Sequence, residues 1–110
     1  MTLPRIGIEG NWFVDAEGRK VILRGVNLGG DCKMPYPNGG TNFPTDFADH
    51  ETVSFIGRPF PLEEADEHFS RLTAWGFNCL RLLTTWEAVE HAGPGRYDTE
   101  YLDYYAELCR

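Results

Sequence analysis

The sequence lacks the clusters of basic residues with which proteins bind nucleic acids. Its 10 Lys and Arg are scattered along 110 residues and are outnumbered by 17 Asp and Glu, so the formal net charge is -7. Phosphate contacts need a basic patch or stripe, so this composition argues against a nucleic-acid-binding role. No polybasic run is present for an anionic membrane surface, and no apolar run approaches the ~20 residues of a membrane span.

Cysteine and histidine are too sparse and too scattered to indicate a metal site. Six such side chains are present: Cys32, Cys79, Cys109, His50, His68 and His91. None has C-x-x-C or other metal-ligand spacing, and three cysteines without a framework fit a reducing compartment. We expect the cysteines to be small buried hydrophobes, the histidines to be non-catalytic, and neither a metal nor another cofactor to be bound.

The N-terminal stretch MTLPRIGIEGNWF lacks the features of a targeting segment. It has no charged region followed by an apolar run, as in a signal peptide, and no Arg/Ser-rich pattern, as in a transit peptide. A soluble, cytoplasmic protein is therefore the expectation.

Hydrophobic residues make up 42% of the chain and aromatics 14%, which is enough for the core of one small domain. The first half predicts a hairpin with arms at 12–14 and 21–27, joined by the turn DAEG. Residues 31–60 then form a long loop. Loops of this length in compact domains are usually functional or disordered, and the aromatics of this one favour order: Tyr36, Phe43, Phe47, Phe55 and Phe60.

Two amphipathic helices flank a strand in the second half. Pro61 and Gly76 bound the first helix, whose apolar stripe is Leu62, Ala65, Phe69, Leu72 and Trp75. Residues 77–83, FNCLRLL, predict a strand of a parallel sheet. Asp98 is the expected N-cap of the second helix, whose expected inner face is Tyr101, Leu102, Tyr105, Leu108 and Cys109.

The order hairpin, strand, loop, helix, strand, loop, helix predicts βαβ units and an α/β fold with a parallel sheet. Two strands and two helices cannot cover both faces of such a sheet. The expectation is therefore the opening part of a larger α/β domain.

Arg81 is the polar exception in the second strand. A buried charge without a partner costs several kcal/mol by rough estimate, so Arg81 predicts a carboxylate at the carboxyl end of this strand. Two alternatives stay open. Arg81 could be a surface residue of an edge strand, or it could pair locally with Glu87 or Glu90.

Ligands of α/β domains bind at the carboxyl ends of the parallel strands. The residues at the two predicted ends are Asn27, Asp31, Lys33, Arg81, Trp86, Glu87 and Glu90. Hydrogen-bonding groups beside a tryptophan plate suit a sugar, whereas core packing is the alternative for Trp86. The stretch GVNLGG lacks the spacing of a phosphate-binding loop.

Three stretches in this order, VILRGVNLGGDCK, GFNCLRLLTTWEAVE and GRYDTEYLDYYAEL, resemble the start of glycoside hydrolase family 5. They resemble most its endoglycoceramidase-like branch, which includes fungal steryl-β-glucosidases and glucosylceramidases. The resemblance implies a (β/α)₈ barrel that cleaves β-glycosides with retention, using glutamates after its fourth and seventh strands. Residues 1–110 would be a partial catalytic domain that consists of an N-terminal hairpin and two βα units. Neither catalytic glutamate would lie within it.

The resemblance also implies roles for single residues. Arg81 would hydrogen-bond the nucleophile glutamate and keep it ionised, and Lys33 would contact the sugar. Asp31 and Trp86 would also bind substrate, and the residues that support the site would be Arg24, Asn27 and Glu90. Many relatives have proline after the glutamate of the W-x-x-x-E motif, where this chain has His91.

The expected function is the N-terminal part of a retaining β-glucosidase acting on a steryl glucoside or glucosylceramide. The chain alone would be inactive, the remaining barrel strands would be its partners, and the long loop's aromatics would line a lipid aglycone channel. Two other readings stay open: a stand-alone carbohydrate-binding or interaction module, and another α/β enzyme such as a flavodoxin-like half.

Overall fold

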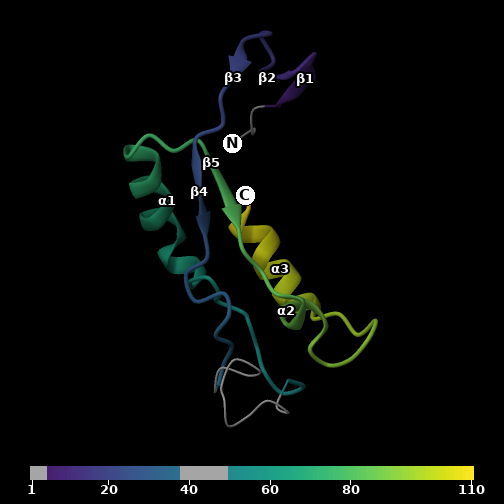
Figure 1. The fold of residues 1–110 in the computed structure, drawn as a ribbon. Helices are drawn as coiled ribbons and strands as arrows, with labels where there is room; N and C mark the ends of the chain where they lie inside the picture. Colours follow the sequence, from purple (N-terminus) through teal and green to yellow (C-terminus); the bar gives the residue numbers. More distant parts are fainter. Residues whose placement is uncertain (1–4, 38–49) are drawn as a thin grey trace.

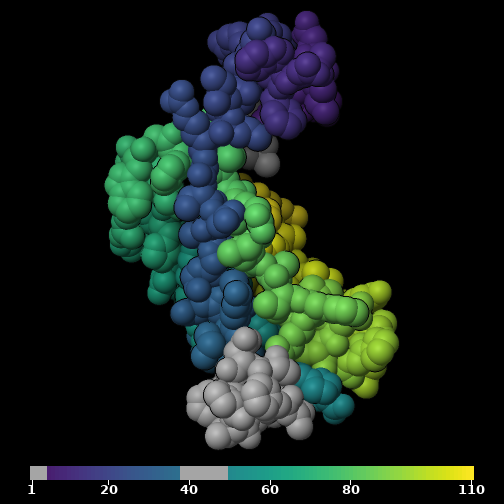
Figure 2. Space-filling model, viewed as in Figure 1, coloured from purple at the N-terminus to yellow at the C-terminus, as the bar shows by residue number. Residues whose placement is uncertain are grey.

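The computed structural model describes residues 5–37 and 50–110, which form two sheets and three α-helices. The antiparallel sheet contains β1 (Gly7–Glu9), β2 (Trp12–Val14) and β3 (Lys20–Val21). The parallel sheet contains β4 (Gly25–Leu28) and β5 (Cys79–Leu82). The small sheet projects from one end of the molecule, and α1 and α3 lie beside the β4–β5 pair (Figures 1 and 2).

The predicted hairpin forms, but its second arm is shorter than expected. Asp15 accepts hydrogen bonds from the amides of Glu17 and Arg19, and Gly18 takes a φ of +77°, so the turn lies where the sequence predicts it. β3 ends at Val21, however, and β4 begins only at Gly25. The expectation of one arm from 21 to 27 is therefore wrong, and β1 was not predicted.

The backbone between β3 and β4 is hydrogen-bonded to the side chain of Asn78. Its Oδ1 accepts from the amide of Arg24 at 2.7 Å, and its Nδ2 donates to the carbonyl of Ile22 at 2.9 Å. The Arg24 carbonyl accepts in turn from the amide of Asn78 at 2.8 Å. These bonds attach the 22–24 backbone to the residue that precedes β5, where the chain passes from the small sheet to β4.

The parallel pairing of β4 and β5 confirms the predicted α/β arrangement. Asn27 lies opposite Arg81, and Leu28 opposite Leu82. Leu28 and Leu82 pack against the core, so the alternation of strand side chains places Asn27 and Arg81 on the other face. Gly25 permits this pairing, because a Cβ there would lie only 2.0 Å from the carbonyl oxygen of Cys79.

The two predicted helices begin and end close to the expected residues, whereas the short helix at residues 86–90 was not predicted. A 3₁₀ turn (Leu62–Glu64) leads into α1 (Ala65–Ala74), and α2 (Trp86–Glu90) follows β5 with Thr85 as its N-cap. In α3 (Thr99–Leu108), the side chain of Asp98 accepts from the Tyr101 amide, which confirms the predicted cap.

The buried face of α3 differs from the prediction at three positions, Leu102, Tyr104 and Cys109. Tyr101, Tyr104 and Leu108 are buried, whereas Leu102 and Cys109 are exposed. The reason is that the hydroxyl of Tyr104 donates to the carbonyl of Phe60, so the 50–60 segment covers the side of α3 that carries Tyr104. Exposure of Cys109 also shows that the expectation of three buried cysteines is wrong, although Cys32 is buried.

The described part of the predicted long loop is ordered and contributes three core residues. The core residues are Val53, Phe55, Phe60, Ala88, Tyr101, Tyr104 and Leu108. Phe55 is buried against Tyr101 of α3, and Phe60 is buried against His68 and Phe69 of α1. Neither can line an aglycone channel as predicted, and the ring of Tyr36 is stacked under Arg58. Phe43 and Phe47, the other candidates for that channel, lie outside the described residues.

Large apolar side chains remain exposed over much of the described surface. Trp75 of the predicted α1 stripe is 66% exposed, and Ile8, Phe13 and Val26 of the strands are also exposed. An uncovered apolar surface of this kind marks a contact with further protein or ligand. Among the described residues, no helix has the length and apolar character needed to cross a membrane.

Replacing Asn78 with Ala should destabilise the 22–24 backbone that connects the two sheets. The substitution removes both side-chain hydrogen bonds to the 22–24 backbone, and we expect the free energy of unfolding to fall by about 1 kcal/mol. Urea unfolding measures the loss, and amide exchange at Arg24 should accelerate. The control is Asn27→Ala, which removes an amide that bonds no described residue. Equal losses in both variants would contradict the role of Asn78.

The alkaline limit of stability should depend on Tyr104. Burial raises the pKa of Tyr104 to about 12 and that of Tyr105 to about 12, whereas an unfolded tyrosine titrates near pH ~10. The folded state holds these protons more tightly, so their stabilisation is complete below pH ~10 and is lost as pH rises through ~12.

Tyr104→Phe should make the fall in unfolding free energy over this alkaline range shallower. Urea unfolding at several pH values from neutral to alkaline measures it, with Tyr97→Phe, at an exposed position, as the matched control. An unchanged slope in Tyr104→Phe would refute the assignment.

Candidate functional site

The candidate site begins on the uncovered face of the β4–β5 pair. Asn27 and Arg81 are register partners near the carboxyl ends of the two strands. A shallow hollow on this face is lined by Leu23, Gly25, Val26, Asn27, Cys79 and Arg81. The topology thus brings together two of the residues that the sequence places at the strand ends.

Arg81 is exposed and makes no ion pair or side-chain hydrogen bond with any residue in 5–37 or 50–110. The alternative of local pairing with Glu87 or Glu90 is therefore wrong for this structure. The carboxylate that Arg81 predicts does not come from the described part of the chain. It stays a prediction, and an uncovered guanidinium on a strand face is open to an acceptor from elsewhere.

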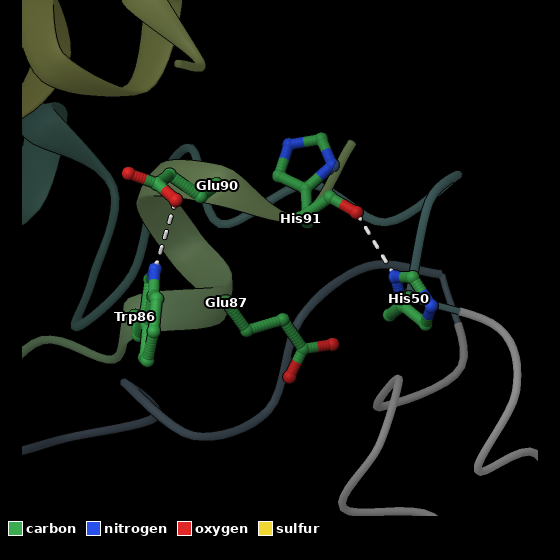
Figure 3. A pocket seen from close by; sticks show the side chains of 5 residues that line it. All are labelled: His50, Trp86, Glu87, Glu90 and His91. Carbon is green, nitrogen blue, oxygen red and sulfur yellow. Dashed lines mark hydrogen bonds between the residues drawn. The ribbon is translucent and has the colours of Figure 1, made fainter. Parts of the chain in front are cut away.

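Trp86 and Glu90, on α2, belong to a second group of candidate residues, whose hollow shares no lining residue with the first. The indole Nε1 of Trp86 donates to Oε2 of Glu90 at 3.1 Å (Figure 3). Trp86 is 79% exposed, so it does not pack in the core of the described residues. An open hollow of about 340 Å³ is lined by His50, Trp86, Glu87, Glu90 and His91. An indole face beside carboxylate acceptors can bind a ligand with apolar faces and hydroxyl groups.

His91 fastens α2 to the rest of the protein, a role that the sequence analysis missed. Its Nε2 lies 2.8 Å from Oδ2 of Asp98, and its Nδ1 lies 3.2 Å from the carbonyl oxygen of Glu51. The carbonyl of His91 also lies 3.0 Å from Nδ1 of His50, as Figure 3 shows. Asp98 uses its other carboxylate oxygen to cap α3. The cap signal at Asp98 was visible in the sequence, but its pairing with His91 had no local signal.

The remaining predicted site residues lie on the loop after β4 or just before it. Asp31 pairs with Arg58, with 3.3 Å between Oδ2 and Nη1. Lys33 is exposed on the same turn. Arg24 precedes β4, and its backbone, rather than its side chain, makes the hydrogen bonds to Asn78. Arg58 was not predicted, because nothing in its local sequence distinguishes it from other surface arginines.

In the described residues, no three His, Cys, Asp or Glu side chains gather as a metal site requires. The polar groups of the candidate site are instead an arginine, an amide, two glutamates and an indole N–H. These groups donate and accept hydrogen bonds, which suits a hydroxyl-rich ligand.

Comparison with known proteins points in the same direction. The chain is similar to fungal glucosidases. It is 55% identical over 104 residues to a glucosylceramidase of Rhizopus delemar, a match that covers 90% of this chain and 15% of that protein. It is 43% identical to a glucosylceramidase of Aspergillus fumigatus, over 100% of this chain and 15% of the relative. No family model matches the chain.

A yeast relative and a solved structure extend the likeness. The chain is 45% identical over 101 residues to an ergosteryl-β-glucosidase of Saccharomyces cerevisiae, covering 87% of this chain and 13% of the relative. The crystal structure of sterylglucosidase 1 from Cryptococcus neoformans matches 88% of this chain with a TM-score of 0.76 and 42% identity. That match covers 14% of the solved chain. The chain thus spans about one seventh of the length of these relatives.

His91→Ala should destabilise the attachment of α2. The substitution leaves the half-buried Asp98 oxygen and the Glu51 carbonyl without their ring partner, and we expect a loss of about 1–3 kcal/mol. Thermal or urea unfolding measures it. Asp103→Ala, which changes an exposed side chain on α3 that bonds no described residue, is the control and should cost about 0.5 kcal/mol or less. If His91→Ala also costs only about 0.5 kcal/mol or less, the hydrogen bonds of the His91 ring do not contribute to stability.

Proposed function

We propose that this chain is the N-terminal part of the catalytic domain of a retaining β-glucosidase that hydrolyses a lipid glucoside, either a steryl glucoside or glucosylceramide. The domain would be a (β/α)₈ barrel of the glycoside hydrolase family 5 type, with β4 and β5 as its first two strands. Residues 1–110 would contribute the N-terminal hairpin and two βα units.

The observation that carries the proposal is the uncovered face of β4 and β5. It presents Arg81 beside Asn27 at the carboxyl ends of two parallel strands, which is where barrel enzymes build their active sites. The similarity to glucosylceramidases and an ergosteryl-β-glucosidase supports the substrate class. The exposed apolar residues of both sheets disfavour a self-contained binding module.

In this proposal, the two catalytic glutamates come from outside residues 1–110. One attacks the anomeric carbon while the other protonates the departing lipid oxygen, and water then hydrolyses the glucosyl-enzyme intermediate. Arg81 donates to the nucleophile carboxylate and keeps it ionised, because a neighbouring positive charge favours the charged form. Trp86 offers an apolar plate for a pyranose face, with Glu90 fixing the indole. Lys33 contacts the sugar.

The test uses the natural gene product that contains this sequence, purified from its source. It should release glucose from steryl β-glucoside and glucosylceramide in mixed micelles, and NMR should detect the β-anomer first. The isolated 110-residue chain should release none. A gene product that cleaves neither lipid, or that yields the α-anomer first, would contradict the proposal.

Arg81→Leu in that gene product should lower kcat/KM by about 10- to 100-fold, because a hydrogen bond to a charged group contributes about 1.5–3 kcal/mol. The acidic limb of the pH–rate profile should move to higher pH, since the nucleophile loses its neighbouring charge. Arg81→Lys keeps a positive charge, so its loss of kcat/KM and its shift of the acidic limb should both be smaller than those of Arg81→Leu. Arg71→Gln, which breaks an exposed pair with Glu67 on α1, is the control and should leave both unchanged. An unaltered pH profile in Arg81→Leu would remove Arg81 from this role.

A further inference from the structure

Arg58 lies in the 54–60 segment, which packs in the core and contacts the turn after β4. The segment carries the buried side chains Phe55 and Phe60 on either side of Arg58. The amide of Arg58 donates to the carbonyl of Phe55 at 2.9 Å, and the carbonyl of Phe60 accepts from Tyr104 of α3. The backbone that carries Arg58 is therefore fixed from both ends, and its side chain is only 16% exposed.

Among the described residues, the guanidinium of Arg58 contacts Tyr36 and Asp31, both on the turn that follows β4. Its central carbon lies 3.9 Å from the centre of the Tyr36 ring, a distance at which a planar cation is attracted to the aromatic face. Its Nη1 lies 3.3 Å from Oδ2 of Asp31. Arg58 thus spans the turn from one end to the other.

Backbone contacts join the same two segments. The amide of Asp31 donates to the carbonyl of Pro59 at 3.2 Å, and Tyr36 and Ser54 exchange two backbone hydrogen bonds of 2.9 Å. Gly30 is packed so closely that a Cβ there would lie 2.7 Å from the Pro59 carbonyl oxygen. The turn therefore rests on the 54–60 segment, with the side chain of Arg58 between the two points of backbone contact.

Lys33 lies on this turn, between Asp31 and Tyr36. We infer that Arg58 is a positioning residue, which fixes the turn so that Lys33 is presented to the sugar, and that Asp31 acts as the partner of Arg58 rather than as a sugar contact. The inference rests on the proposed function and replaces the substrate-binding role expected for Asp31. Arg58 acts through the turn and touches no reacting atom.

The planar shape of the guanidinium matters as well as its charge. Lysine could keep the pairing with Asp31, but it cannot lie flat on the Tyr36 ring while reaching that carboxylate. The Nε of Arg58 is buried and has no acceptor among the described residues, so stacking and the Nη1 contact hold the group in place. Arg58→Lys should therefore rescue only part of the loss in Arg58→Gln.

Kinetics of the natural gene product test the substrate side of the inference. In Arg58→Gln, we expect KM for the lipid glucoside to rise about tenfold with kcat within about twofold, the pattern of lost uniform binding. Arg58→Lys should give an intermediate KM. The matched control is Arg71→Gln, which breaks an exposed pair with Glu67 on α1 and should leave both constants unchanged. An unchanged KM in Arg58→Gln overturns the positioning role.

A double-mutant cycle tests the assignment of Asp31. If Asp31 acts only through Arg58, the double variant Asp31→Asn with Arg58→Gln has the KM of Arg58→Gln alone. If Asp31 touches the sugar directly, the two losses multiply, and that outcome overturns the assignment.

Hydrogen exchange separates this inference from the proposed function. Amides of residues 29–37 should exchange at least severalfold faster in Arg58→Gln than in wild type or Arg71→Gln, because the turn loses its contacts with the guanidinium. Unchanged exchange overturns the inference, whatever the activity. If the wild-type gene product cleaves no lipid glucoside, the proposed function fails and the presentation of Lys33 to a sugar fails with it, while exchange still decides whether Arg58 holds the turn.

Discussion

The close approach of β4 to β5 at Gly25 is the constraint on which the rest of the structure depends. A side chain at position 25 would overlap the Cys79 carbonyl, so the absence of one permits the parallel register that sets Asn27 beside Arg81. The same register turns Leu28 and Leu82 toward the core. One pairing thus creates a packed face and a polar, uncovered face, and the candidate site lies on the second.

Long polar side chains and buried aromatics then hold the surrounding loops. Asn78 bonds the backbone between the small sheet and β4, His91 ties α2 to the N-cap of α3, and Arg58 braces the turn after β4. The aromatic residues of the 50–60 segment pack in the core and so stabilise the backbone that makes these contacts. The site residues lie on β4, on β5, on α2 and on the turn after β4, and the contacts of His91 and Arg58 fix α2 and that turn.

The sequence predicted the helices and strands better than the side-chain contacts between them. Hydrophobic periodicity and cap residues located both long helices, and the apolar run around Arg81 indicated a parallel strand. The pairings of Asn78 and Arg58, and that of His91 with Glu51, were not predictable, because each joins residues far apart in the chain. The pairing of His91 with Asp98 spans a loop and leaves no periodic signal either. Tyr104 was missed because the buried face of a helix depends on what covers it. The grouping of Asn27 with Arg81 followed from the strand-end rule for α/β folds.

The most direct test of the account is a structure of the natural gene product that contains this chain, determined without ligand. The account predicts a glutamate carboxylate from another strand of the same barrel within hydrogen-bonding distance, ~3 Å, of the Arg81 guanidinium, above the uncovered face of β4 and β5. An Arg81 that faces only solvent, or that meets an acidic group unrelated to a barrel strand, would contradict the central claim that this face is one wall of a glucosidase active site.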